Sequence, residues 1–357
     1  MRGRAPAPPD YASGDLALPV HQFPRGGPHA ARTIETSMLE IAEFISPKPT
    51  PVWKLAQQCG VNLAVAGLPF DTLRPGETVG DLAPLTRMKA DYEAGGFDIR
   101  VIESRPPLNK AKRGLEGRDE EIDVVCELLT SMGKLGIPVW CYEWMTDFNW
   151  VRTTMNTPSR GGSVVTSFDA NDVPDDITSN PPISEEELWT NLEYFLKRVV
   201  PVAEKANVKL SMHPDDPPIT PIKGVSRIMR TIDNYHRLLQ LVPSKVNTIT
   251  MCQGNFTLMT DDLPREIRRF GDKISFVHFR DVRGVPTKFE ETWHDAGKTD
   301  MLATMKAYKD INFDGVLRPD HVPTVEGDSN ENAGYSAFGR LYAIGYIRGL
   351  QQAVYAR

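Results

Sequence analysis

The sequence has few cysteines, no long apolar run and no excess of basic residues. Its four cysteines, Cys59, Cys126, Cys141 and Cys252, show no CxxC or other paired spacing, which favours a protein of the reducing cytoplasm. No apolar run approaches the roughly 18 residues that span a bilayer, so no membrane segment is expected. The 41 basic and 47 acidic residues give a net charge of -6, which argues against a nucleic-acid or membrane-surface partner.

A glycine-rich dinucleotide-binding loop is also missing, because no GxGxxG follows the first expected strand. The chain of 357 residues is long for one domain unless that domain is a barrel. Residues 1–33 are rich in proline and glycine and have no apolar periodicity, so we expect a flexible N-terminal extension, with a partner-binding arm as the alternative. Residues 34–357 are expected to form one catalytic domain.

From about residue 37 onward, short apolar runs alternate with amphipathic segments of helical length. This alternation predicts parallel strands joined by helical crossovers, and eight strand candidates favour a closed (β/α)8 TIM barrel over an open sheet. The strand candidates are residues 39–44, 62–66, 98–103, 138–142, 209–213, 247–252, 275–280 and 315–320. The helix candidates are residues 50–58, 82–94, 116–135, 185–206, 224–241, 263–270 and 299–311.

One polar segment, residues 153–184, interrupts this alternation. It is rich in proline, glycine and aspartate and has no helical period. A loop of this length inside a compact domain is usually functional or disordered. Because it follows the strand candidate 138–142, it is expected near the active-site face, either as a lid or as an inert excursion.

Four residues with metal-binding side chains stand at the ends of successive strand candidates: His213, Cys252, His278 and Asp320. A barrel collects such residues at one face, although a lone His or Cys is more often structural. Two imidazoles, one thiolate and one carboxylate suit Mn, Fe, Co or Zn better than Ca or Mg. An ion that takes five or six ligands keeps positions open for a substrate, which predicts a catalytic site.

Polar side chains beside these four residues suit a small anionic, hydroxylated substrate. Arg280 follows His278 by two residues and is expected on the same barrel face, where it could bind a carboxylate bidentately. His321, next to Asp320, has the pKa range for proton transfer, with a supporting hydrogen bond to a ligand as the alternative role. Tyr335 precedes the final helix and is a second candidate for proton transfer.

Three further residues are weaker substrate-binding candidates. Asp215 and Asp216 follow His213 in the rigid Pro-Asp-Asp-Pro-Pro loop, where Asp215 could equally cap that loop. His294 lies in Trp293-His294-Asp295.

At these residues the chain resembles the mannonate dehydratase family, metal-dependent lyases on a xylose-isomerase-like TIM barrel. The resemblance runs from about residue 38 to the C-terminus. The matching blocks are residues 201–204, 212–218, 251–254, 276–280, 318–321 and 334–341, and more weakly Trp150-x-Arg152-Thr153. It implies that His213, Cys252, His278 and Asp320 bind the metal, that Arg280, His321 and Tyr335 serve substrate binding and proton transfer, and that Arg152 contacts the substrate.

The chain departs from the family pattern at five places. Residues 66–69 replace a His-His pair, and residues 105–109 replace a Pro-x-His-Glu segment. Residues 289–291 read Phe-Glu-Glu instead of Phe-His-Glu, and Pro323 replaces a histidine. The long helical insertion of relatives is shortened to residues 153–184. The metal-binding half of the pattern is retained, while the N-terminal half of the substrate pocket differs.

The resemblance implies a hydro-lyase that dehydrates a sugar acid, with D-mannonate as the leading substrate and 2-keto-3-deoxy-D-gluconate as the product of this step of glucuronate catabolism. One divalent transition metal, Mn²⁺ or Fe²⁺, is the expected cofactor, and a cytoplasmic homo-oligomer, dimer or higher, is the expected assembly. The alternatives are a paralogous dehydratase for another aldonic acid, a sugar isomerase or epimerase, and a non-catalytic sugar-acid binding protein. Cys252 argues against an isomerase, which normally builds its metal site without a thiolate.

Overall fold

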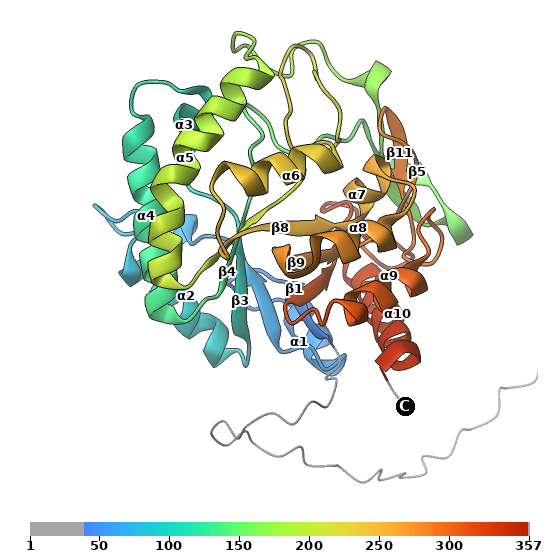
Figure 1. The fold of residues 1–357 in the computed structure, drawn as a ribbon. Coiled ribbons are helices and arrows are strands. Elements are labelled where there is room, and N and C mark those ends of the chain that lie inside the picture. The colour runs from blue at the N-terminus through green and yellow to red at the C-terminus, as the bar shows by residue number, and fades with distance from the viewer. Residues whose placement is uncertain (1–38, 356–357) are drawn as a thin grey trace, which may run out of the picture. The chain divides into compact units, whose positions relative to one another are not determined.

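Eight parallel strands form a closed barrel (Figure 1). This computed structural model describes residues 39–355, and the strands follow the order β1-β12-β9-β8-β7-β4-β3-β2 around the barrel. Their bounds are β1 Glu40–Phe44, β2 Leu63–Ala66, β3 Asp98–Glu103, β4 Val139–Tyr142, β7 Lys209–Met212, β8 Asn247–Cys252, β9 Ile274–Phe279 and β12 Val316–Pro319. The eight strand candidates and the TIM barrel are confirmed. The extension expected at residues 1–33 lies outside the described residues.

The barrel strands are short apolar runs that become buried on both faces, as parallel strands require. Every residue of β8, β9 and β12 is buried. Alternate residues of several strands, among them Val65, Val101 and Phe276, form an apolar cluster separate from the larger core that includes helical side chains. We assign this smaller cluster to the barrel interior, because side chains alternate between the two faces of a strand.

Helices follow most of the barrel strands and supply apolar side chains to the larger core. Their bounds are α1 Pro51–Gln58, α2 Leu82–Ala94, α3 Asn109–Arg113, α4 Arg118–Leu135, α5 Glu185–Ala206, α6 Ile232–Leu241, α7 Gln253–Met259, α8 Leu263–Phe270, α9 Met301–Asp310 and α10 Ala337–Tyr355. The helix expected from residue 224 begins only at Ile232, because the Thr231 side chain accepts a hydrogen bond from the Asn234 amide and caps the helix there. The short helices α3 and α7 were not predicted.

A second, antiparallel sheet differs from the loop expected at residues 153–184. It has the order β10-β11-β6-β5, and β5 (Thr154–Pro158) and β6 (Val164–Asp169) come from that segment. The other two strands, β10 (Val282–Val285) and β11 (Lys288–Glu291), follow β9 in the chain, and β11 is the one that pairs with β6. Phe168 of β6 lies opposite Phe289 of β11, and the two rings pack 5.7 Å apart. This sheet is therefore built from the segments that leave the carboxyl ends of β4 and β9, which is the end of a barrel where active sites lie.

Within residues 39–355, no helix is both long and apolar enough to cross a membrane.

Candidate active site

The four residues expected to bind a metal come together at the carboxyl ends of neighbouring strands. His213 directly follows β7, Cys252 ends β8, His278 lies near the end of β9 and Asp320 directly follows β12. These four strands are consecutive in the barrel order, so their ends are adjacent in space. The ligand atoms of His213, Cys252 and His278 all lie within 4.8 Å of one another. Asp320 Oδ2 lies 3.6 Å from His278 Nδ1.

The tautomer of His213 suits metal binding. Its Nδ1 lies 2.7 Å from the carbonyl oxygen of Pro214, and because a carbonyl only accepts, Nδ1 must carry the hydrogen. The lone pair of Nε2 then faces the cluster, where Nε2 lies 3.2 Å from His278 Nδ1. Two imidazole nitrogens, a thiol and a carboxylate in this arrangement fit a divalent transition metal.

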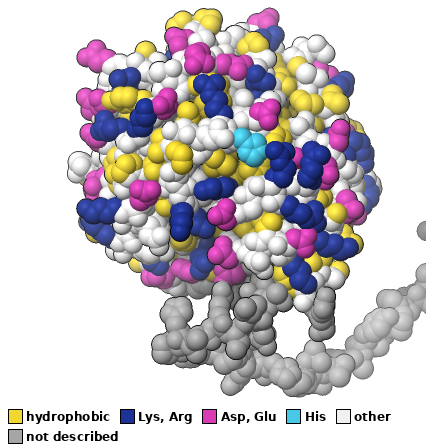
Figure 2. All heavy atoms as spheres, viewed as in Figure 1, with side chains coloured by type: hydrophobic (Ala, Val, Ile, Leu, Met, Phe, Trp, Pro, Cys, Tyr) yellow, Lys and Arg dark blue, Asp and Glu magenta, His cyan; other side chains and the backbone are white. Residues whose placement is uncertain are grey.

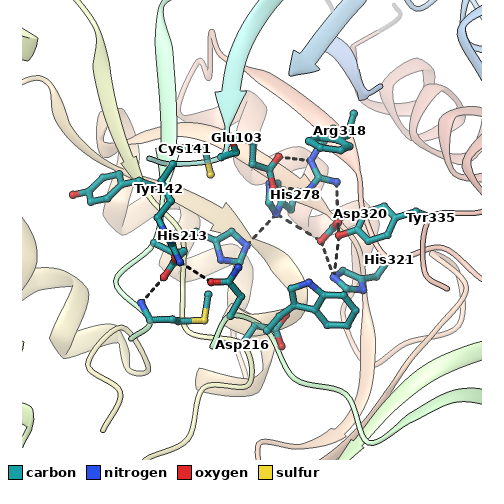
Figure 3. A pocket seen from close by; sticks show the side chains of 17 residues that line it. Glu103, Cys141, Tyr142, His213, Asp216, His278, Arg318, Asp320, His321 and Tyr335 are labelled. Atoms are coloured by element: carbon teal, nitrogen blue, oxygen red, sulfur yellow. Dashed lines mark hydrogen bonds and ion pairs between the residues drawn. The ribbon is translucent and has the colours of Figure 1, made fainter. Parts of the chain in front are cut away.

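A cavity of about 320 Å³ opens beside this cluster (Figure 3). Six residues singled out from the sequence line it: His213, Asp216, His278, Asp320, His321 and Tyr335. The sequence argument missed many of the other lining residues, which are Phe44, Glu103, Ser104, Arg105, Cys141, Tyr142, Glu143, Met145, Asn149, Trp150 and Arg318. Glu103 and Tyr142 are the last residues of β3 and β4. The metal ligands were predicted from polar side chains at strand ends, and the same criterion would have selected these two residues.

Tyr335 and His321 lie together on the cavity wall. The Tyr335 hydroxyl is 3.3 Å from Asp320 Oδ1 and 3.5 Å from His321 Nε2. His321 has a positive φ of 41°, a conformation that non-glycine residues rarely adopt and that often marks functional positions. Burial lowers the pKa of His321 to about 4 and raises the pKa of Tyr335. A protonated phenol and an unprotonated imidazole therefore share one side of the cavity at neutral pH.

Arg280 lies in a buried network of charges and does not line the cavity described in residues 39–355. Its Nε donates to Cys252 Sγ at 3.2 Å, and its terminal nitrogens donate to Asp216 at 2.8 Å, to Asn255 at 2.9 Å and to Glu291. A side chain at Gly254 would come within 2.9 Å of this guanidinium, so the glycine permits the close approach. Its donors contact protein groups in the structure, and the expected substrate contact of Arg280 stays a prediction.

Arg152 completes the same network from the other side. It donates to both oxygens of Asp216, at 2.6 and 3.0 Å, and to Glu291 Oε1 at 2.5 Å. The network thus pairs two guanidinium groups with two carboxylates, which is how buried charges are tolerated. Asp216 belongs both to this network and to the cavity wall.

Asp215 and His294 also lie outside the cavity wall formed by the described residues. Asp215 Oδ2 accepts a hydrogen bond of 2.6 Å from the Met229 amide, so it holds the loop, as its alternative role predicted. Burial raises the pKa of Asp215 to about 6. His294 is fully buried, and burial lowers its pKa to about 4.

Glu103 lies beside the second nitrogen of His278, and Arg318 pairs with Glu103. Glu103 Oε1 lies 3.2 Å from His278 Nε2, and Arg318 donates to both Glu103 oxygens at 2.8 and 2.7 Å. Burial opposes ionisation of Glu103, but the charges and hydrogen bonds of Arg318 and His278 together outweigh it and lower the Glu103 pKa to about 2. Ligand atoms of Glu103, Cys141 and His278 also lie within 4.8 Å of one another.

Comparisons with known proteins agree with the family resemblance. A family model described as D-mannonate dehydratase (UxuA) matches residues 50–180 and 176–357. The mannonate dehydratase of Oceanobacillus iheyensis is 35% identical over 298 residues, covering 76% of this chain and 85% of that protein. That of Enterococcus faecalis is 34% identical over 319 residues, covering 79% and 88%.

Solved structures give the same result. The crystal structure of mannonate dehydratase from Streptococcus suis serotype 2 has a TM-score of 0.79 and 32% identity, covering 89% of this chain and 93% of that one. D-psicose 3-epimerase from Clostridium cellulolyticum H10 has a TM-score of 0.57 at 12% identity, which reflects the shared fold alone.

Proposed function

Because the chain belongs to the D-mannonate dehydratase family and is therefore a hydro-lyase, we propose that it converts D-mannonate to 2-keto-3-deoxy-D-gluconate and water. One observation carries this proposal. A set of metal-binding side chains borders a cavity whose wall also holds two proton-transfer groups, Tyr335 and His321. We place the reaction in glucuronate catabolism, where D-mannonate is the substrate of such a step.

We propose that His213, Cys252, His278 and Asp320 hold one divalent transition metal, Mn²⁺ or Fe²⁺. The mixed nitrogen, sulfur and oxygen donors and the tautomer of His213 support this assignment. When bound, the ion would supply a Lewis acid that offsets the negative charge developing beside the substrate carboxylate as the C2 proton leaves.

The protein's own residues account for the two proton transfers. Dehydration breaks the C2–H and C3–O bonds, so one group must accept the C2 proton and another must protonate the departing C3 hydroxyl. Tyr335 and His321 can share these tasks because their polar atoms lie 3.5 Å apart on the cavity wall. The resulting enol then becomes the 2-keto product by taking up a proton at C3 and losing the proton of its C2 hydroxyl.

We propose that Arg280 and Arg152 act by positioning other residues. Arg280 contacts Cys252 and lies 3.2 Å from Asp320 Oδ2, so it orients two of the proposed metal ligands. Arg105, whose side chain is 24% exposed and lines the cavity, is the better candidate for contact with the substrate. Its own contacts are with Glu143 and Asn149 of the cavity wall, so we assign it to substrate hydroxyl groups away from the metal.

The proposed activity is tested with a panel of aldonic acids. The metal-loaded protein should release a 2-keto-3-deoxy acid from D-mannonate, with a specificity constant of at least about 10⁴ per molar per second, the low end for natural enzymes. Preference for another aldonic acid would identify a paralogous dehydratase, a ketose product would identify an isomerase, and binding without turnover would identify a binding protein. Each of these three outcomes would overturn the D-mannonate assignment.

We also propose a reducing, cytoplasmic setting and a homo-oligomer. All four cysteines are free in the structure, which is consistent with a reducing compartment. Sedimentation of the purified protein tests the assembly, because a monomer at working concentrations would contradict it.

A further inference from the structure

We infer that Glu103 and Arg318 are positioning residues that hold His278 and Asp320 in the geometry needed for metal binding. This inference rests on the metal site proposed above and extends it to two residues outside the ligand set. Neither residue was expected from the sequence to take part in the site.

The contacts form a continuous chain from one ligand to the other (Figure 3). Arg318 donates to both oxygens of Glu103 and also donates to Asp320 Oδ1 at 2.8 Å. Glu103 Oε1 in turn lies 3.2 Å from His278 Nε2. One ion pair, formed between β3 and β12, therefore contacts two proposed ligands at once.

The two contacts use one atom of each ligand and not the other. Arg318 donates to Oδ1 of Asp320, whereas Oδ2 lies 3.6 Å from His278 Nδ1 and 3.2 Å from Arg280 Nε. A carboxylate beside Nε2 of His278 favours the tautomer that carries the hydrogen on Nε2, which leaves the lone pair of Nδ1 for the metal. Within the described residues Nε2 makes no hydrogen bond, and Glu103 Oε1, 3.2 Å away, is the carboxylate oxygen beside it.

A second metal site is the competing explanation for the position of Glu103, because ligand atoms of Glu103, Cys141 and His278 are close enough to hold an ion. The charge arrangement argues against it. Arg318 already pairs with both oxygens of Glu103, and its positive charge would repel a dication bound there. Cys141 Sγ lies 3.2 Å from the Thr250 hydroxyl, so the thiol already has a neutral hydrogen-bonding partner.

The experiment is a calorimetric titration of Mn²⁺ into the full-length protein after metal removal. Glu103→Gln keeps the size of the side chain but removes its charge, and it should weaken Mn²⁺ binding about 10- to 100-fold, as loss of a partner that orients a ligand does. Arg318→Lys keeps the positive charge but not the bidentate geometry, and it should also weaken binding. If Glu103→Gln fails to fold, Arg318→Lys alone decides the question.

Glu266→Gln is the matched control. Glu266 is also buried and paired with arginines, Arg265 and Arg269, but it lies on α8 outside the cavity wall. Its substitution should leave Mn²⁺ affinity at the wild-type value while removing the charge of a buried carboxylate that pairs with two exposed arginines.

Two outcomes would overturn the inference, and each differs from failure of the metal site itself. Wild-type affinity in folded Glu103→Gln or Arg318→Lys would show that the pair positions nothing. Two Mn²⁺ ions per wild-type chain, falling to one in Cys141→Ser, would make Glu103 a ligand of a second site. Failure of the proposed function would instead appear as full Mn²⁺ binding by the His213→Ala, Cys252→Ala double variant.

Discussion

The hydroxyl of Tyr335 lies 3.5 Å from Nε2 of His321, so a phenol and an imidazole meet at one side of the cavity. An elimination needs one base and one acid on a single substrate, and these two residues provide both. Because the Tyr335 hydroxyl also lies 3.3 Å from Asp320, it is close to the metal ligands as well.

Replacement of Tyr335 by Phe removes the hydroxyl and keeps the ring. We expect kcat for D-mannonate to fall roughly 10²- to 10⁴-fold, the usual effect of losing a proton-transfer group. Metal content and thermal midpoint should stay near the wild-type values, because the ring still packs against the His321 ring, 5.3 Å away. Steady-state kinetics decide the role, since an unchanged kcat with a raised KM would make Tyr335 a binding residue only.

Glu291 is expected to be essential for stability because it accepts hydrogen bonds from both Arg152 and Arg280 in the buried network. Glu291→Gln would leave two buried guanidinium groups that share Asp216, with Asp320 as a further carboxylate beside Arg280 alone. We expect the free energy of unfolding to drop by roughly 3–5 kcal/mol, the cost of breaking a buried pair. Urea denaturation measures this change.

A surface ion pair provides the control for that experiment. Asp175 is 98% exposed and pairs with Lys223, so Asp175→Asn should leave the unfolding midpoint unchanged. A Glu291→Gln midpoint equal to that of this control would show that the buried network contributes little to stability.

Arg105 provides a test of substrate discrimination. Its guanidinium contacts Glu143 and donates to Asn149 at 2.8 Å, and it lines the cavity. Arg105→Ala should raise KM for D-mannonate by roughly 10- to 100-fold, the value of a charged hydrogen bond of about 1.5–3 kcal/mol. The effect on kcat should be much smaller, because Arg105 is not proposed to transfer protons.

Comparison with D-lyxonate locates this contact on the substrate. This five-carbon acid matches D-mannonate at C2, C3 and C4 but lacks the final carbon. If Arg105 binds the far hydroxyl groups, Arg105→Ala should reduce the preference for D-mannonate over D-lyxonate, whereas an unchanged preference would place the contact elsewhere.

The N-terminal extension is expected to be dispensable for folding, because residues 1–33 lack apolar periodicity. A protein that starts near residue 33 should keep the thermal midpoint of the full chain. A drop of more than a few degrees, or a change in sedimentation, would indicate that the extension packs on the domain or on a neighbouring copy.

The barrel could be predicted because each strand is a short apolar run and its end is marked by polar residues. The same rule located His213, Cys252, His278 and Asp320, since consecutive strand ends are adjacent in a closed barrel. Glu103 was missed although it also ends a strand, because no neighbouring motif in the sequence connects it to His278. Its role depends on the approach of β3 toward the end of β9 across the barrel.

The antiparallel sheet could not be predicted from local sequence. Residues of β6 pair with β11, more than a hundred positions later in the chain, and the flanking Pro and Gly residues conceal the alternation of β6. The contacts of Arg280 were hidden for the same reason. The sequence placed Arg280 two residues after His278. Only the folded chain shows that its terminal nitrogens donate to Asp216, Asn255 and Glu291.

The central claim is that the four strand-end residues bind one metal, and X-ray absorption of the metal-loaded protein tests it most directly. The protein loaded with one Zn²⁺ as a probe should show one sulfur neighbour at about 2.3 Å, with nitrogen or oxygen neighbours at about 2.0–2.2 Å. The sulfur signal should disappear in Cys252→Ser and persist in Cys141→Ser. A first shell without sulfur in the wild-type protein, or one whose sulfur persists in Cys252→Ser, would contradict the account.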